Sequence, residues 1–195
     1  MRVLVACEHS GVVRRAFAAL GHDAWSCDVL PAEDESPNHI KDDVRKHLEE
    51  GWDLMVAHPP CTHIACSGGA WFAEKRADGR QQEGIDFFME MWNAPIEKVA
   101  VENPISIMST VFQPPSQIIN PWMFGHPECK ATCLWIRKMP LLRPTAVVPE
   151  KDRIRGWSDN MPETKDRWKK RSRTFEGIAA AMAAQWSGPP RGFFW

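Results

Sequence analysis

Short apolar runs that are typical of buried β-strands alternate with helix-like segments through the first half of the chain. The apolar runs predicted to be strands cover Arg2–Ala6, Asp23–Val29, Asp53–Ala57 and Lys98–Val101. The segments between them that are predicted to be helical are Val12–Leu20, Val44–Glu50 and Arg80–Trp92. Strands that alternate with helices in this way predict an α/β fold with one doubly wound, mostly parallel sheet.

The second half of the chain is less regular. Residues 105–127 are rich in Pro, Asn and Gln, so we expect an irregular connection there. Ala131–Arg137 is predicted to be a later strand, and Thr174–Trp186 an Ala-rich helix. A length of 195 residues fits one domain, 1–195, in which residues 140–173 form a small basic loop or subdomain.

The sequence shows no sign of a membrane or secretory segment. No stretch approaches the roughly 20 apolar residues that span a bilayer, and the N-terminal run lacks a secretory cleavage site. We therefore expect a cytoplasmic protein, or one in the host cytoplasm if a phage encodes it, whose cysteines remain thiols. These are Cys7, Cys27, Cys61, Cys66, Cys129 and Cys133.

Positive charge is concentrated in one segment. The net charge of the chain is −1, yet Lys151–Arg173 holds nine basic and four acidic side chains. A cationic segment on an otherwise acidic body suits a partner that carries phosphates. A solvated helix face is the alternative explanation for the same charges.

Polar residues gather where the predicted strands end. In sheets of this kind, ligands bind beyond the carboxyl ends of the strands. The residues at these ends are Glu8–Gly11, Asp28, Pro59–Cys61 and Glu102–Pro104. We therefore expect the functional site at this edge of the sheet.

Cys61 is the first candidate for chemistry, because it follows a buried strand and two prolines that rigidify the strand exit. The thiolate form of such a cysteine is a nucleophile. A buried, unreactive thiol is an alternative of equal weight. Zinc is a further alternative, since His58, Cys61, His63 and Cys66 are all possible ligands. Structural zinc sites usually split their ligands into two separated pairs, however.

Glu102 is the second candidate. A carboxyl group at a strand exit, beside a nucleophile from the neighbouring strand, can hold a substrate proton. In a poorly solvated pocket we expect its pKa to rise, which would keep the group protonated and able to donate. A solvated loop glutamate is the alternative.

Together these segments resemble the cytosine-C5 DNA methyltransferase family. That family has a Pro-Cys nucleophile motif after one strand and a Glu-Asn motif after the next, here Pro60-Cys61 and Glu102-Asn103-Pro104 in the same order. The stretch from Phe124 to Thr132 resembles a further motif of the family, and Thr174 begins the segment that corresponds to its final cofactor-facing helix. The resemblance spans most of the chain and implies the Rossmann-like fold of class I methyltransferases, which depend on S-adenosyl-L-methionine (SAM).

The resemblance implies roles for individual residues. Those that would act on the base are Cys61, Glu102, Asn103 and Lys130. Those that would bind the cofactor are Glu8, His9, Ser10, Gly11, Asp28, Asp43 and Pro59. The basic segment would bind DNA, through Arg155, Trp168, Lys169, Lys170, Arg171 and Arg173.

The chain also departs from the family pattern. Thr62 stands where the family has Gln, and Gly11 is the single glycine of a cofactor loop that is usually glycine-rich. The large target-recognition domain is absent, as in the compact methylases of bacteriophages. Two alternatives therefore remain: the same chemistry on a free cytosine nucleotide, or a non-catalytic nucleic-acid- or metal-binding module on a decayed methylase scaffold.

Overall fold

The structure is a computed structural model that describes residues 1–156, 161–164 and 167–188. These residues build one seven-stranded sheet in the order β3-β2-β1-β4-β5-β7-β6. Strands β1 to β5 run parallel to one another, whereas β7 is antiparallel to both β5 and β6. The strands are β1 (Arg2–Ala6), β2 (Asp23–Asp28), β3 (His39–Lys41), β4 (Leu54–Ala57), β5 (Lys98–Pro104), β6 (Gln117–Ile119) and β7 (Thr132–Arg137).

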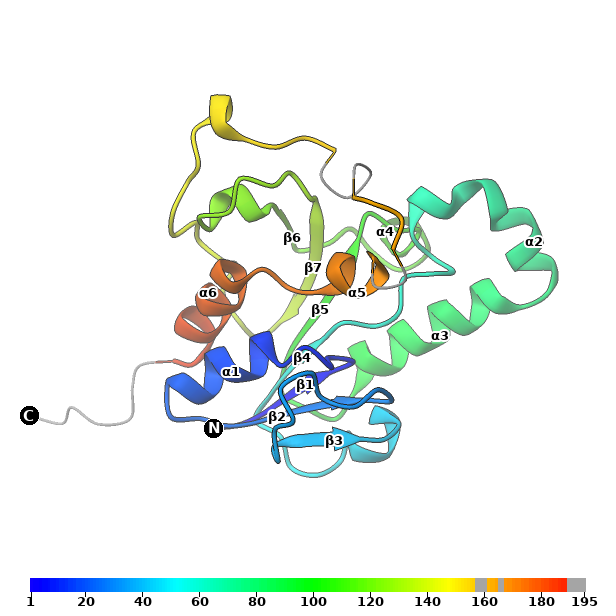
Figure 1. Cartoon of the computed structure of the whole chain (residues 1–195). Coiled ribbons are helices and arrows are strands. Elements are labelled where there is room, and N and C mark those ends of the chain that lie inside the picture. Colours follow the sequence, from blue (N-terminus) through cyan, green and yellow to red (C-terminus); the bar gives the residue numbers. More distant parts are fainter. Residues whose placement is uncertain (157–160, 165–166, 189–195) are drawn as a thin grey trace, which may run out of the picture.

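Helices cover both faces of this sheet (Figure 1). The α-helices are α1 (Val12–Ala19), α2 (Phe72–Ala77), α3 (Arg80–Asn93), α4 (Met108–Val111), α5 (Arg167–Ser172) and α6 (Glu176–Trp186). The short 3-10 helices are η1 (Val44–His47), η2 (Cys66–Trp71), η3 (Pro121–Met123) and η4 (Glu150–Asp152). None of the described helices is long and apolar enough to cross a membrane.

The side chains of β1 point alternately to the two faces of the sheet and so enter both layers of the core. Val3 and Val5 point to the side covered by α1 and α6, where they pack in one buried apolar cluster. Leu4 and Ala6 point to the opposite side and join the cluster that α3 supplies with Phe88 and Met91. Successive side chains of a strand face opposite ways, so a strand that is apolar throughout needs a helix layer on each face.

The predicted architecture is confirmed: the fold is α/β, with a doubly wound, mostly parallel sheet. Several local predictions were incomplete. Residues 105–127 contain α4 and β6, and the two short strands β3 and β6 were not predicted. Strand β5 continues to Pro104 because β7 pairs with it along its whole length. The segment predicted to be helical at Val44–Glu50 is a 3-10 helix of four residues.

Candidate active site

The carboxyl ends of β1, β2, β4 and β5 meet at one edge of the sheet. The register pairs Ala6 with Cys27 and with Ala57, and Ala57 with Val101. The residues that follow these positions therefore emerge side by side, as the sequence predicts. This edge brings together the turn with Cys61, the end of β5 with Glu102, and the loop that starts at Cys7.

The turn that carries Cys61 is fixed on both sides. The backbone amide of His58 donates to the carbonyl oxygen of Ala6 at 2.9 Å, which joins the exit of β4 to that of β1. After the two prolines, the carbonyl oxygen of Cys61 accepts from the amides of Ile64 and Ala65 at 3.1 and 2.8 Å. Cys61 is thus held in a rigid turn, and it is only partly exposed.

The environment of the Cys61 thiol disfavours the thiolate. Burial raises its pKa, and the negative charge of Glu102 raises it further. A contact with its own backbone amide and the charges of Lys130 and Arg171 partly oppose this rise. Because charges act strongly over short distances in a poorly solvated site, this coupling indicates that Cys61, Glu102, Lys130 and Arg171 share one site.

Glu102 is paired with a histidine. Its Oε2 lies 3.1 Å from Nδ1 of His58, and the two side chains are 19% and 10% exposed. Burial opposes ionisation of this carboxyl group, but the hydrogen bond and charge of His58, with the charge of Lys130, outweigh it and lower the pKa of Glu102. The expectation of a raised pKa is therefore wrong for the free protein, because the neighbouring histidine was not foreseen.

Asn103 ties the two motifs together. Its side-chain amide donates to the carbonyl oxygen of Pro59 at 2.9 Å, and the residue is 1% exposed. Its Oδ1 has no hydrogen-bond partner among the described residues. Asn103 thus fixes the end of β5 against the turn that bears Cys61.

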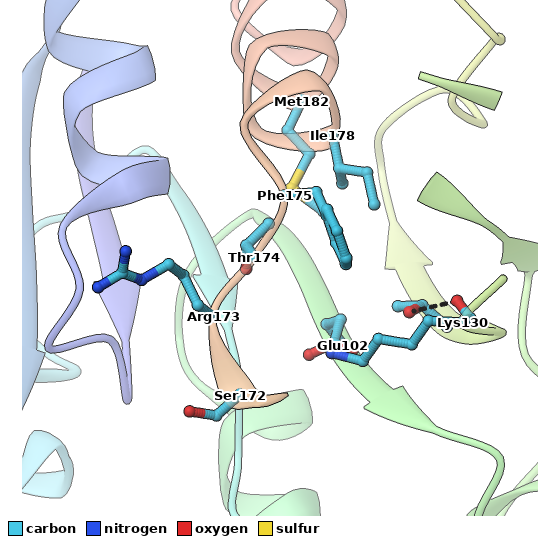
Figure 2. Close-up of a pocket in the computed structure, with 9 residues that line it drawn as sticks. Glu102, Lys130, Ser172, Arg173, Thr174, Phe175, Ile178 and Met182 are labelled. Carbon is cyan, nitrogen blue, oxygen red and sulfur yellow. Dashed lines mark hydrogen bonds between the residues drawn. The ribbon is translucent and has the colours of Figure 1, made fainter. Parts of the chain in front are cut away.

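A small cleft opens beside Glu102 (Figure 2). Lys130 lies next to Glu102 on one side, and the chain from Ser172 to Phe175 forms the other side. The Nζ of Lys130 donates to the carbonyl oxygen of Arg171 at 2.7 Å, which attaches α5 to this wall. The full lining is Glu102, Lys130, Thr132, Ser172, Arg173, Thr174, Phe175, Ile178 and Met182.

The loop predicted to bind the cofactor is internally bonded. The carboxylate of Glu8 accepts from the backbone amides of Val13 and Arg14 at 2.7 and 3.2 Å, and from the hydroxyl of Ser10 at 3.2 Å. Glu8 is buried, so in this structure its carboxylate stabilises the start of α1. Gly11 precedes α1 with a φ of 67°, a conformation that favours glycine.

The predicted cofactor acids lie together at the exits of β2 and β3. Burial raises the pKa of the Cys7 thiol, and the charges of Asp28 and Asp43 raise it further, which places both carboxylates near Cys7. Asp28 accepts from the amide of Leu30 at 2.9 Å through one oxygen. Asp43 is committed to Arg45, which binds both of its oxygens. Asp28 thus fits a role on ribose hydroxyls better than Asp43 fits one on adenine.

The described residues 167–173 of the basic segment lie against the loop predicted to bind the cofactor. The ring of Trp168 lies 5.9 Å from that of His9, and Arg173 pairs with Glu33. Glu33 also lies 3.4 Å from Nε2 of His9. Trp168 and Arg173, both predicted to bind nucleic acid, are therefore engaged within the protein in this structure.

The remaining basic residues of the prediction differ in their surroundings. Lys169 has its Nζ 5.7 Å from the ring of Trp168, and Arg155 pairs with Glu150 at 3.2 Å in an exposed position. Lys170 and Arg171 are exposed next to the cleft. Part of the predicted basic subdomain, residues 157–160 and 165–166, lies outside the described residues.

The zinc alternative finds no support in the geometry. Within residues 1–156, 161–164 and 167–188, no three His, Cys, Asp or Glu side chains are grouped so that they could hold a metal ion. His58, the first residue of the proposed ligand run, is paired with Glu102. All six cysteines are free. Sequence reasoning considered His58 only as a ligand and missed this pairing, although a histidine next to the nucleophile turn is itself a signal.

Comparisons with known proteins bear on the fold. No protein-family model and no curated protein matches the chain. One solved structure that matches is provisionally described as a DNA modification methyltransferase encoded within a prophage, from E. coli. The two are 15% identical with a TM-score of 0.50, and the match covers 84% of this chain and 56% of that chain. The chain thus spans little more than half the length of that structure and shares its Rossmann-like methyltransferase fold.

Proposed function

We propose that the protein is a SAM-dependent methyltransferase that modifies carbon 5 of cytosine in DNA through a covalent bond between Cys61 and C6 of the base. The observation that carries this proposal is the meeting of Cys61 and Glu102 at the ends of adjacent parallel strands. The match to a solved structure described as a DNA modification methyltransferase supports it. So does the small cleft that Glu102 and Lys130 line.

The two side chains answer the main chemical difficulty of the reaction. C5 of cytosine is a poor nucleophile, and addition of a thiolate to C6 makes it reactive. Cys61 forms the S–C6 bond, and Glu102 holds a proton at N3, which stabilises the negative charge that develops on the ring. Lys130, on the same wall of the cleft, is suited to the base carbonyl oxygen. The C5 proton then leaves to a base and the thiolate is expelled.

The loop at the ends of β1 and β2 fits the nucleoside part of the cofactor. SAM supplies the methyl group when it is bound. Asp28 keeps one carboxylate oxygen without a hydrogen-bond partner among the described residues. This oxygen can accept a hydrogen bond from a ribose hydroxyl. Gly11, the buried Ser10 and the ring of His9 shape the loop from Cys7 to Gly11.

DNA would approach over α5. Lys170 and Arg171 are exposed beside the cleft, where ammonium and guanidinium groups can bind phosphates on either side of a base that has left the stack. Trp168, 52% exposed, offers a ring on which a base can stack. Because these cations would bind phosphates, we expect binding that weakens steeply with salt.

The deciding experiment is to incubate the protein with SAM and duplex DNA that contains 5-fluorocytosine. The fluorine cannot leave as a proton does, so the enzyme remains bound to the base. We expect an adduct that survives denaturation, is absent in Cys61→Ser, and forms normally in Cys66→Ser, which removes an exposed thiol five residues away. No adduct with the wild-type protein, or one that persists in Cys61→Ser, overturns the proposal.

The substrate is tested in the same series. Methyl transfer is measured with DNA and with dCMP side by side. A preference for dCMP would keep the chemistry and replace the substrate. Failure of SAM to raise the melting temperature would instead indicate a scaffold that has lost its cofactor.

A further inference from the structure

A partly buried histidine–carboxylate pair lies beside the proposed nucleophile. His58 directly follows β4, and Glu102 lies in β5 next to Val101, the residue that pairs with Ala57. This register brings Nδ1 of His58 to 3.1 Å from Oε2 of Glu102. With side chains that are only 10% and 19% exposed, the pair is shielded from the water that weakens ion pairs at the surface.

The position of the His58 ring is closely determined. Its backbone amide is bonded to Ala6, and the following Pro59 restricts its backbone conformation. The other ring nitrogen, Nε2, is buried and has no hydrogen-bond partner among the described residues. Leaving a buried polar nitrogen unpaired costs free energy. A side chain with a packing role alone would avoid this cost.

The proposed reaction needs a proton that Glu102 does not itself hold. Addition of the Cys61 sulfur to C6 moves electron density toward N3, which must then take up a proton. In the free protein the pKa of Glu102 is lowered, as described above, so the carboxyl group is ionised. The ring of His58 can supply the missing proton, because its Nδ1 already faces the carboxylate at hydrogen-bond distance.

We propose that His58 is the positioning residue for Glu102 and the source of the proton that Glu102 delivers to N3. As the S–C6 bond forms, the Nδ1 proton of the imidazolium passes to the carboxylate, and the carboxyl group gives its proton to N3. The imidazole is left neutral. When the S–C6 bond breaks, the proton returns from N3 through Glu102 to His58. This inference rests on the proposed function, and no other group is consumed.

Other charged and titratable groups surround the pair. The charge of Lys130, from the loop before β7, lowers the pKa of Glu102. The charge of Glu102 in turn raises the pKa of Cys61 and that of Cys133 of β7. Those at the neighbouring edge are Arg171 of α5, whose charge lowers the pKa of Cys61, and Cys7, Asp28 and Asp43 at the exits of β1, β2 and β3. Among the described residues, His58 is the one whose side chain shares a hydrogen bond with the Glu102 carboxylate.

The test replaces His58 by Asn, whose side-chain amide can still donate near the Nδ1 position but carries no titratable proton. Single-turnover methyl transfer to DNA is followed from acid to alkaline pH. In the wild type the rate falls as pH rises through loss of the proton that the pair shares. In His58→Asn, Glu102 must be protonated on its own, so this fall moves to lower pH and the rate at neutral pH drops at least about tenfold, with partial recovery in acid.

The matched control is His63→Asn, which removes a histidine two residues beyond Cys61 and should keep the wild-type pH profile. Placing His58→Asn in a Glu102→Gln background gives a second readout: we expect no further loss, because the two residues act as one unit. Circular dichroism checks folding, and His58→Gln replaces the Asn variant if that variant is unfolded.

The outcomes separate this inference from the function on which it rests. A wild-type protein that forms no Cys61-dependent adduct refutes the proposed function itself. A wild-type protein that is active, while His58→Asn keeps the wild-type profile or is slowed equally at every pH, overturns the role of His58 alone. Full additivity with Glu102→Gln also overturns it.

Discussion

Asn103 donates its side-chain amide to the carbonyl oxygen of Pro59 at 2.9 Å, across the gap between the ends of β5 and β4. The donor is 1% exposed. This bond explains why an asparagine follows Glu102. It fixes the distance between the Glu102 carboxyl group on β5 and the Cys61 thiol, which follows β4.

Replacing Asn103 by Ala should lower the free energy of unfolding by about 1–3 kcal/mol, because it leaves a buried carbonyl oxygen without its donor. The urea midpoint measures this change. The matched control is Asn93→Ala, at an exposed position at the end of α3, which should stay within about 0.5 kcal/mol of the wild type. Equal effects of the two substitutions would contradict the structural role of Asn103.

The Cys61 thiol should be slow to react with alkylating agents at neutral pH. Burial and the Glu102 charge raise its pKa, so the thiolate that reacts is scarce below that pKa. Glu102→Gln removes the negative charge, lowers the pKa of Cys61 and should speed its alkylation several-fold at fixed pH. The modified Cys61 peptide is quantified by mass spectrometry.

The exposed Cys66 provides an internal reference in this experiment, since both thiols lie in the same short segment. Its rate should change little in Glu102→Gln. A slower reaction of Cys61 in that variant would show that the charge of Glu102 does not act on the thiol as described.

Local sequence pattern was sufficient to predict the sheet and the edge where the site lies. The apolar runs ending at Ala6, Ala57 and Val101 are buried strands, and parallel pairing places their next residues together. Cys61 and Glu102 could be singled out as candidates on this basis, and the resemblance to the cytosine-C5 DNA methyltransferase family favoured them over a buried thiol and a solvated glutamate.

Contacts between distant segments could not be predicted. The pairing of Glu102 with His58 depends on the register of β4 and β5, and it reversed the expected direction of the Glu102 pKa. Lys130 and Arg171 are 41 residues apart, and Arg173 and Glu33 are 140 apart. No periodicity indicates such pairs, because they arise only when the whole chain has folded.

Gly177 in α6 should be intolerant of even one methyl group. A Cβ added there would overlap the carbonyl oxygen of Phe124, a backbone atom of the chain that crosses the start of α6. The amide of Gly177 also donates to Nε2 of His126 at 3.0 Å, so the helix cannot easily move away. Alanine favours a helix over glycine by about 1 kcal/mol, which acts in the opposite direction.

We expect the steric term to prevail, so Gly177→Ala should destabilise the protein by about 1–3 kcal/mol in urea unfolding. Gly69→Ala is the control, because a Cβ at Gly69 would meet its nearest neighbour, the Phe72 ring, at 3.9 Å, an ordinary contact. If Gly177→Ala were as stable as the wild type or more so, the close crossing of α6 and Phe124 would be refuted.

The contact between Arg173 and Glu33 should hold residues 167–173 against the loop predicted to bind the cofactor. Glu33 also faces Nε2 of His9 at 3.4 Å, and His9 lies against Trp168. Glu33→Gln removes the charge that joins these groups. Since partly exposed ion pairs contribute about 0–1 kcal/mol each, the segment should open more often, but only by a modest factor.

Limited trypsin digestion measures this opening, because Lys169, Lys170 and Arg171 are cleavage sites within the segment. We expect cleavage there to be about two- to fivefold faster in Glu33→Gln, as a loss of up to 1 kcal/mol implies. The matched control is Glu97→Gln, whose exposed partner is Lys138 at 3.3 Å and which should leave the rate unchanged. Because Lys130 still holds the carbonyl of Arg171, the segment should loosen without detaching. An unchanged rate in Glu33→Gln would mean that Lys130 and the His9–Trp168 contact suffice to keep it closed.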